Sequence, residues 1–209
     1  MNVRCKISME DIADKKKAIL ESTLKLVVEH GFHGTPMSLV AKKANVAAGT
    51  IYHYFESKDE LICSLYAYNK SRVVATINTA LMPGGFSKEI FFKSCTNLYR
   101  FYCQNTDVLV FFEQYINSPY NTNKCASPFQ GKFYDFFKKG IEQDLLKDLK
   151  PEILVVYTLS NIANAAKLNK YGSISFSEAD FKNVLIMLWD GITKNLEDKH
   201  FNPNDKPSQ

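Results

Sequence analysis

The sequence predicts an all-α protein of about nine helices, arranged in two parts. No alternation of apolar and polar residues typical of a β-strand persists anywhere in the 209 residues. Residues that start and stop helices divide the chain instead into segments whose apolar side chains recur at helical spacing. The sequence Pro83-Gly84-Gly85 interrupts this pattern, so we expect it to separate the two parts.

The first helix is expected from residue 8 to about His30. Ser8, followed three positions later by Asp11, has the pattern of a capping box at its start. Gly31 suits the left-handed backbone that commonly ends a helix. The apolar stripe of this helix is expected to close over the segment that follows, and consists of Leu20, Leu24, Val27 and Val28.

Residues 37–55, with the sequence MSLVAKKANVAAGTIYHYF, predict two short helices joined by a tight turn. Thr35 is expected to cap the first of them, with Pro36 at the first helical position, where a missing N–H costs nothing. Asn45 is expected to turn the chain, because few residues besides glycine tolerate left-handed backbone. This layout is that of a helix-turn-helix, whose second helix enters the major groove of DNA.

The second of these helices is expected to divide its side chains between a core and an outer surface. Ile51 and Phe55 lie four positions apart and are expected to face the core. Tyr52, His53 and Tyr54 would then point outward. The alternative is a short buried hairpin with aromatic core residues, but three adjacent rings cannot all face one core from a helix.

Ser57 and Glu60 form a second capping-box pattern, which opens a helix expected to run to about Leu81. Beyond the Pro-Gly-Gly break, five more helices are expected at residues 87–104, 107–117, 129–148, 151–170 and 178–196.

An ordered string of residues in the first third of the chain resembles the TetR family of bacterial regulators. The resemblance covers about Lys16 to Leu65 and rests on Glu29-His30-Gly31-Phe32, Thr35, Val40-Ala41, Ala44-Asn45-Val46, Gly49-Thr50-Ile51-Tyr52-His53-Tyr54-Phe55 and Ser57-Lys58-Asp59-Glu60-Leu61. It implies a ligand-responsive transcriptional regulator, expected to be a repressor. The expected partners are a palindromic operator in double-stranded DNA, a second copy of the chain, and a small hydrophobic or aromatic effector that releases the operator.

The resemblance also assigns roles by position. Phosphate contacts are expected from the hydroxyl and ammonium groups of Thr35, Thr50, Tyr52, Tyr54 and Lys58. Contacts to base edges are expected from Ala48, Gly49 and His53. Ala47 and Ala48 stand where a serine and a longer polar residue are common in the family, and Asn45 stands where glycine is usual. The side chains of these alanines cannot form hydrogen bonds with base edges. Apolar contacts and DNA shape are therefore expected to contribute more to recognition of the operator sequence.

The resemblance and the break together predict the division into domains. We expect a DNA-binding domain at 8–56, a connecting helix at 57–82, a ligand-binding and dimerisation domain at 83–197, and a disordered tail at 198–209.

A pocket for a flat or hydrophobic molecule is expected in the second part, where aromatic residues are dense between Phe91 and Phe137. Adjacent pairs such as Phe111-Phe112 cannot share one helix face, although core packing of a helical bundle is the alternative. The residues expected to line the pocket are Asn97, Tyr99, Phe101, Tyr102, Phe112, Glu113, Tyr115, Phe133, Tyr134 and Phe137.

The last two helices carry apolar stripes that either complete the protomer's core or pair with a symmetry mate. The resemblance favours pairing, and a twofold dimer also supplies two recognition helices at the spacing of one turn of DNA. The expected interface residues are Leu159, Ile162, Ala163, Ala166, Phe181, Val184, Leu188 and Ile192.

Amino-acid composition limits which classes of protein, and which cellular locations, the sequence is compatible with. A chain that is 45% hydrophobic and 23% charged can bury a substantial core. No apolar run reaches the length of a membrane span, and the N-terminus lacks the apolar core of a signal peptide, so a cytoplasmic protein without a membrane partner is expected. A net charge of +4 is too mild to indicate nucleic acid by itself.

The spacing of cysteine and histidine predicts no cofactor and no metal. The five cysteines contain no CxxC pair and the four histidines show no ligand spacing, so reduced, core-filling thiols are expected. A regulator that senses thiol reagents or electrophiles through Cys103 or Cys125 is the alternative. The chain has no G-x-S-x-G, HExxH or P-loop motif, so an enzyme is only a remote alternative.

Overall fold

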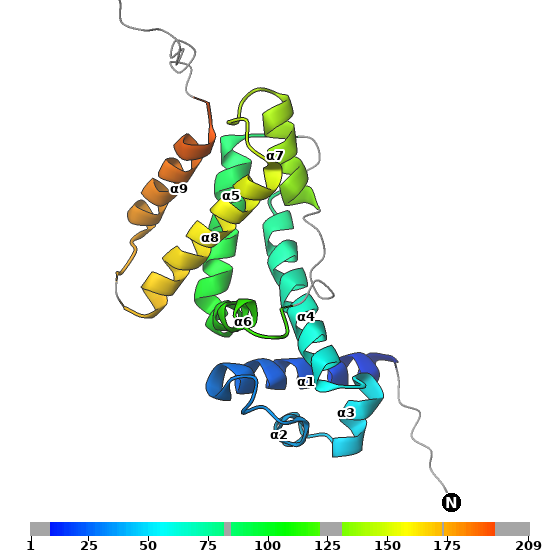
Figure 1. Cartoon of the computed structure of the whole chain (residues 1–209). Coiled ribbons are helices and arrows are strands. Elements are labelled where there is room, and N and C mark those ends of the chain that lie inside the picture. Colours follow the sequence, from blue (N-terminus) through cyan, green and yellow to red (C-terminus); the bar gives the residue numbers. More distant parts are fainter. Residues whose placement is uncertain (1–8, 82–84, 122–130, 173, 195–209) are drawn as a thin grey trace, which may run out of the picture. The chain divides into compact units, whose positions relative to one another are not determined.

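The computed structural model describes residues 9–81, 85–121, 131–172 and 174–194, with side chains from Ala13 onward. Over these residues the regular structure is helical, apart from an isolated bridge between Leu146 and Thr193 (Figure 1). The helices are α1 (Met9–His30), α2 (Met37–Lys43), α3 (Ala48–Tyr54), α4 (Lys58–Asn78), α5 (Lys88–Gln104), α6 (Thr106–Ile116), α7 (Lys132–Glu142), α8 (Pro151–Lys170) and α9 (Glu178–Ile192). The prediction of an all-α protein with about nine helices is therefore confirmed.

The chain divides into two compact units whose limits differ from the expected ones. Unit 1 holds Met1–Val73 and Asn105–Ser127, and unit 2 holds Val74–Gln104 and Pro128–Gln209. The division therefore falls inside α4 rather than at the Pro-Gly-Gly break, and α6 joins unit 1. Sequence periodicity shows that α6 has an apolar face but does not show which helix covers it.

Unit 1 is built around α1, which contacts α2 and α6. The ring of Phe32, just after α1, lies 6.1 Å from that of Phe111 on α6 and 5.0 Å from that of Tyr120. Tyr66 of α4 stacks on Tyr115 of α6 at 4.5 Å. These contacts explain why α6 belongs to the unit that carries the helix-turn-helix.

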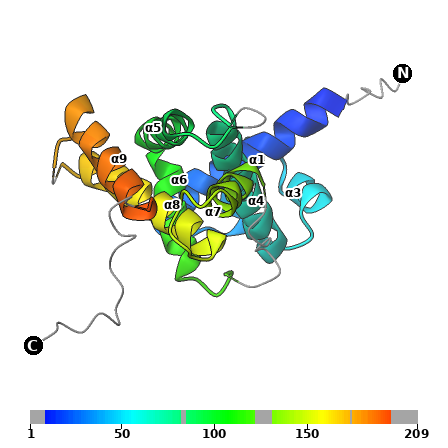
Figure 2. The same ribbon diagram turned by 90° about the horizontal axis from the view of Figure 1, so that it is seen from above.

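Unit 2 is a helical bundle in which α8 packs against α5, α7 and α9. Figures 1 and 2 both show α9 lying alongside α8 at the edge of this bundle. Phe181 of α9 stacks on Tyr99 of α5 with ring centroids 3.9 Å apart. Phe91 of α5 packs with Phe136 and Phe137 of α7 at 6.4 and 6.3 Å.

Three helices end earlier than their sequence patterns predicted, and one of them is α4, which ends at Asn78 instead of near Leu81. The segment expected to be helical to residue 148 stops at Glu142, because Asp144 adopts left-handed backbone with φ 58°. The Asp144 N–H donates to Ile141 O at 2.9 Å and the Leu145 N–H to Gly140 O at 3.0 Å, which is a Schellman cap. α9 likewise ends at Ile192, where Thr193 becomes extended.

Several expectations fall on residues that the structure does not describe. They are the Ser8 cap, the first two residues of the Pro83-Gly84-Gly85 break, Cys125 and the tail at 198–209. Among the described helices, none combines the length and the apolar character needed to span a bilayer.

Candidate nucleic-acid interface

In the turn between α2 and α3, Asn45 adopts the left-handed backbone conformation expected of it. Asn45 has φ 54°, in the left-handed region, directly after the last residues of α2. Its N–H donates to Lys42 O at 3.3 Å, and the N–H of Val46 donates to Ala41 O at 3.0 Å. These two bonds form a Schellman cap, which satisfies the last carbonyls of α2 and sets the direction in which α3 leaves.

Replacing Asn45 with glycine is expected to stabilise this turn. Left-handed backbone costs an L-residue about 1–2 kcal/mol, whereas the extra freedom of glycine in the unfolded chain costs about 0.4–1 kcal/mol. Asn45→Gly should therefore raise the free energy of unfolding by about 0.5 kcal/mol, and Asn45→Ala should lower it by about 1 kcal/mol. Hydrogen exchange localised to residues 37–55 measures both, because one global unfolding curve would average the two units of the chain. A less stable glycine variant would show that the Asn45 side chain itself holds the turn.

The exposed face of α3 carries the residues expected to approach DNA. Ile51 and Phe55 are buried at 0% and 1% exposure, which confirms their expected place in the core. Tyr52, by contrast, is 57% exposed. His53 is exposed as well, as are Ala48 and Gly49 at the start of the helix, while Thr50 and Tyr54 are half-buried. A helix held by two core side chains thus presents a small-residue end and two ring side chains to the outside.

Thr35 does not cap α2, although its sequence position suggested an N-cap. Helix α2 begins at Met37, and Pro36 occupies the N-cap position without a side-chain hydrogen bond. The Thr35 side chain is buried at 1% exposure, and its hydroxyl donates to Gly31 O at 2.8 Å. The hydroxyl therefore ties the loop to the end of α1 in this conformation, instead of capping α2 or facing solvent.

Lys58, at the start of α4, is also engaged within the protein. Its ammonium donates to the carbonyl of Phe32, and partial burial lowers the pKa of this group. Beside it, the Glu60 N–H donates to Ser57 Oγ at 3.1 Å, as a capping box requires. The Glu60 carboxylate instead accepts the N–H of Glu56 at 2.6 Å, so only half of the expected box forms.

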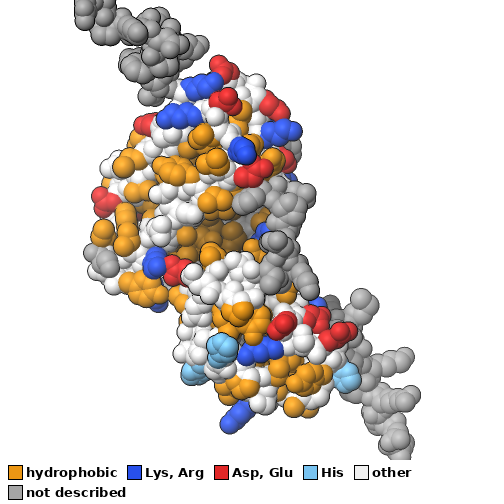
Figure 3. Space-filling view, viewed as in Figure 1, with side chains coloured by type: hydrophobic (Ala, Val, Ile, Leu, Met, Phe, Trp, Pro, Cys, Tyr) orange, Lys and Arg blue, Asp and Glu red, His pale blue; other side chains and the backbone are white. Residues whose placement is uncertain are grey.

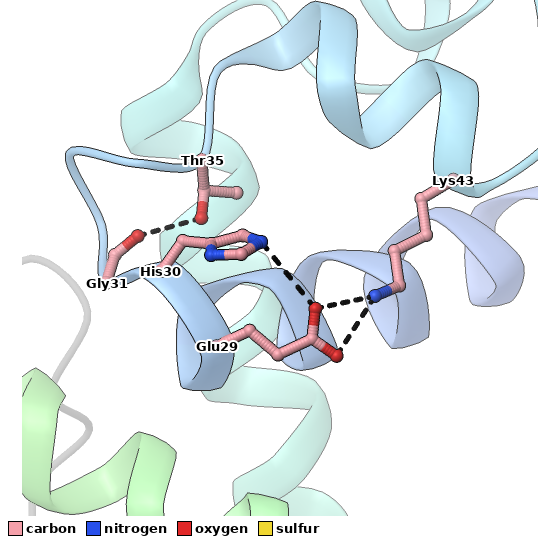
Figure 4. A network of polar contacts seen from close by, with 5 residues as sticks. All are labelled: Glu29, His30, Gly31, Thr35 and Lys43. Atoms are coloured by element: carbon pink, nitrogen blue, oxygen red, sulfur yellow. Dashed lines mark hydrogen bonds and ion pairs between the residues drawn. The ribbon is translucent and has the colours of Figure 1, made fainter.

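An ion pair that the sequence did not indicate joins α1 to α2. Lys43 Nζ donates to both carboxylate oxygens of Glu29, at 2.9 and 3.2 Å, and His30 Nε2 lies 3.7 Å from the same group (Figure 4). The hydrogen bond from Lys43 lowers the pKa of Glu29. Lys43 and the neighbouring Lys42 are both exposed, so the ion pair lies at the surface. Their fourteen-residue separation explains why local sequence patterns missed the pair.

The ten residues expected to line an effector pocket are divided between the two units. Phe112, Glu113 and Tyr115 lie on α6 in unit 1, and the other seven lie in unit 2. The Tyr115 hydroxyl donates to Tyr120 O at 2.9 Å. In unit 2, Phe133 and Phe137 are buried with ring centroids 4.9 Å apart, and burial raises the pKa of Tyr102.

Two polar members of that set have partners of their own. Asn97 Nδ2 donates to Thr79 Oγ1 at 3.0 Å, and Tyr99 stacks on Phe181 while hydrogen bonding with Cys103. Burial, together with Cys103, raises the pKa of Tyr99 to about 12. Many of the predicted pocket residues thus take part in ordinary core packing, and the pocket remains a prediction.

The expected interface stripes on α8 and α9 largely face the protomer's own core. Ile162, Ala166, Phe181, Leu188 and Ile192 are buried within the protomer, and Leu159, Ala163 and Val184 are half-buried. The alternative that these stripes complete the protomer's core therefore holds for the buried residues, because α5 and α7 already cover them. An α-helix has a second face, and that face is the one available to a partner.

Four exposed apolar side chains of the same helices, together with the exposed Gly191, form what we call the α8–α9 face, defined by Ile153, Val156, Tyr157, Met187 and Gly191. Met187 is 72% exposed and Ile153 is 50% exposed. A Cβ atom added at Gly191 would lie 3.5 Å from the Tyr157 hydroxyl, so the two helices meet closely here. Figure 3 shows hydrophobic side chains over this part of unit 2.

The cysteines depart in one place from the expectation of reduced thiols. Cys63 on α4 is disulfide-bonded. Cys95 is a free, buried thiol whose pKa is raised by burial, and Cys103 is free and half-buried, with its Sγ 3.8 Å from Asn169 Nδ2. In the part of the chain that the structure describes, no group of His, Cys, Asp and Glu is arranged to hold a metal ion.

Comparison with known proteins agrees with this arrangement along most of the chain. The family profile described as "Bacterial regulatory proteins, tetR family" matches residues 19–65, and that described as "Tetracyclin repressor-like, C-terminal domain" matches residues 87–193. An uncharacterised HTH-type transcriptional regulator of Haemophilus influenzae is 27% identical over 181 residues, which cover 87% of this chain and 97% of the relative. The repressor KstR of Mycolicibacterium smegmatis is 36% identical over 72 residues, or 34% of this chain and 35% of KstR.

Solved structures share the fold. A TetR-family regulator from Marinobacter aquaeolei superimposes with a TM-score of 0.82 at 20% identity, covering 90% of this chain and 100% of that one. A TetR-family regulator from Haemophilus influenzae has a TM-score of 0.78 at 27% identity, covering 88% and 98%.

Proposed function

Because the chain belongs to the TetR family of bacterial transcriptional regulators, we propose that it represses transcription by binding a palindromic operator as a homodimer. It is a DNA-binding regulator and not an enzyme. The observation that carries the proposal is the construction of α3, with Ile51 and Phe55 in the core and Tyr52 and His53 exposed. A helix anchored in this way can enter the major groove without disturbing its own support.

The α8–α9 face is our candidate for the dimer interface. Exposed, contiguous apolar side chains on a soluble protein favour burial against a partner, and a twofold dimer makes such a surface self-complementary. Dimerisation would also supply the second recognition helix, at about 34–36 Å or one turn of B-DNA from the first.

Selection from a random DNA pool with the full-length protein tests the proposal directly. We expect enrichment of a palindrome whose half-sites lie about one helical turn apart. Band shifts over a range of salt concentrations should then show an affinity that falls steeply as salt rises, because phosphate contacts release counterions. Weak binding without enrichment of any sequence would contradict operator recognition by α3.

Variants on α3 should separate phosphate contacts from base contacts. Tyr52→Phe removes an exposed hydroxyl and should weaken binding to all DNA sequences by a similar factor, because phosphates carry no sequence information. His53→Ala should instead change the preference among operators by about 1–3 kcal/mol at one base pair. Shift assays on the selected operator and on single-base variants measure both effects. A His53 variant that loses affinity equally on every sequence would assign His53 to the phosphate contacts.

The second part of the proposal is that a small hydrophobic or aromatic effector releases the operator. The support is the aromatic interior of unit 2, together with relatives of the same fold. The FadR regulator of Bacillus subtilis was solved with stearoyl-CoA and superimposes with a TM-score of 0.67 at 16% identity, covering 83% of this chain and 96% of FadR. Coupling between effector and operator is reciprocal, so operator DNA should weaken effector binding by the same factor, typically about 5–150-fold.

A thiol-sensing regulator is the second candidate, and the half-buried Cys103 supports it. Its sulfur lies between Tyr99 and Asn169, two side chains that a modified thiol would displace. Operator release by an alkylating reagent, measured on the full chain and on Cys103→Ser, separates the two candidates. A Cys103→Ser protein that keeps its response to a small hydrophobic effector favours the first.

A further inference from the structure

Two buried hydroxyl groups in unit 2 have no hydrogen-bond partner. Ser94 on α5 is 0% exposed and Thr158 on α8 is 1% exposed, and neither hydroxyl oxygen has a partner in the structure. The hydroxyls of Thr23, Thr35 and Thr193, by contrast, each donate to a carbonyl four residues earlier, at 2.7, 2.8 and 3.0 Å. Leaving a buried hydroxyl unpaired is unfavourable, so two in one bundle indicate a missing partner.

The two hydroxyls lie on the buried faces of two neighbouring helices. α5 and α8 pack against each other and cross at an angle, each starting near α7 (Figure 1). Near their C-terminal ends, Cys103 Sγ lies 3.8 Å from Asn169 Nδ2. Ser94 precedes Cys103 by nine residues, which is about 13.5 Å along the axis of α5. Thr158 precedes Asn169 by eleven residues, which is about 16.5 Å along the axis of α8. Counted along the helices from that contact, the offsets of the two positions therefore differ by about 3 Å.

Both positions interrupt apolar stripes. Ser94 lies between Phe91 and Leu98 on the buried face of α5, and Thr158 lies between Leu154 and Ile162 on that of α8. An alanine or a valine would fill the same space without an unpaired polar atom. Among the described residues of unit 2, these two are also the buried polar side chains, and no buried charge accompanies them.

We propose that Ser94 and Thr158 are the polar anchor of the effector site, which takes an elongated apolar molecule whose inward polar group is uncharged. A hydroxyl both donates and accepts, so the pair matches an alcohol, carbonyl or ester, whereas a carboxylate or an ammonium group would enter the bundle without a compensating charge. This inference rests on the proposed effector response and names the chemical class of that effector.

Matched probes on the full-length protein test the inference. The probes are 1-decanol, decanoate and decylamine, which share an alkyl chain and differ in the charge of the head group. Binding can be followed by calorimetry and by the fluorescence of Trp189, the single tryptophan of the chain, which lies 5.3 Å from Phe91. We expect 1-decanol to bind at least tenfold more tightly than either charged probe.

A double variant, Ser94→Ala with Thr158→Val, should lower the affinity for 1-decanol at least tenfold. Because both hydroxyls are unpaired in the free protein, the variant's own melting temperature should stay level or rise. Ser175→Ala, which removes an exposed hydroxyl from the same unit, is the matched control and should change neither quantity.

Three outcomes would overturn the inference: charged probes that bind as tightly as 1-decanol, no binding of 1-decanol, or an unchanged affinity in the double variant. A double variant that melts earlier yet binds 1-decanol normally would mean that the hydroxyls hold only an internal water. Operator binding is measured separately on the free proteins. If the wild-type protein bound no operator, the proposed repressor function would be contradicted, regardless of how the probes bind.

Discussion

Met187→Glu is expected to convert the proposed dimer to a monomer and to lower operator affinity at least a hundredfold. Met187 is 72% exposed in the protomer, so the substitution does not disturb the protomer's own core. In a twofold interface the change places two carboxylates in an apolar contact, where each loses its hydration without gaining a partner. A monomer presents one recognition helix in place of two and contacts about half as many phosphates.

Sedimentation analysis and operator shifts measured over the same protein concentrations check this expectation. Met187→Leu conserves volume and apolar character, so it should remain dimeric and bind the operator normally. A Met187→Glu protein that sediments as a dimer and binds normally would exclude the α8–α9 face as the interface. The dimer would then have to form through another surface of the chain.

The second large effect is expected from Ile51→Ala, which should abolish operator binding and loosen α3. Ile51 is 0% exposed and is the buried side chain of a helix only seven residues long. Truncating a buried isoleucine to alanine costs about 2–5 kcal/mol, and a helix this short has little stability of its own to offset the loss. The exposed Tyr52 and His53 would then lose the rigid support that positions them.

Hydrogen exchange localised to residues 48–55 is the appropriate measurement, because the chain contains two units and one global unfolding curve would average them. Exchange there should become much faster in Ile51→Ala, while α8 in unit 2 keeps its protection. Ile51→Val, which costs about 0.5–1.5 kcal/mol, should retain operator binding. Unchanged exchange in Ile51→Ala would mean that Phe55 alone holds α3 in place.

Local sequence patterns were sufficient wherever the structure is decided by neighbouring residues. The helix predicted over residues 151–170 is α8, with the same bounds, because Pro151 begins it and a continuous stripe maintains it. Asn45 and Gly31 both adopt the left-handed backbone expected of them, with φ 54° and 69°. In each case the cause lies within one or two helical turns of the residue.

Patterns failed where the decisive partner is distant in sequence or is a backbone group. Thr35 has the side chain of an N-cap, yet its hydroxyl donates to Gly31 O. Lys43 is exposed at the end of α2, but no local pattern indicates that it binds Glu29 fourteen residues away. Asp144 ends α7 by adopting a backbone that aspartate takes far less often than glycine.

The sequence by itself determined that the chain is helical and where the helix-turn-helix lies. It also determined which family the chain resembles. It also determined which side chains share a helix face, since the helical period alone decides that. Only the tertiary structure decided what covers each face. It assigned α6 to unit 1, turned the buried stripes of α8 and α9 toward the protomer's core, and left Ile153, Val156 and Met187 outside. The physical reason is that burial depends on which apolar faces meet in space, and periodicity carries no information about the partner.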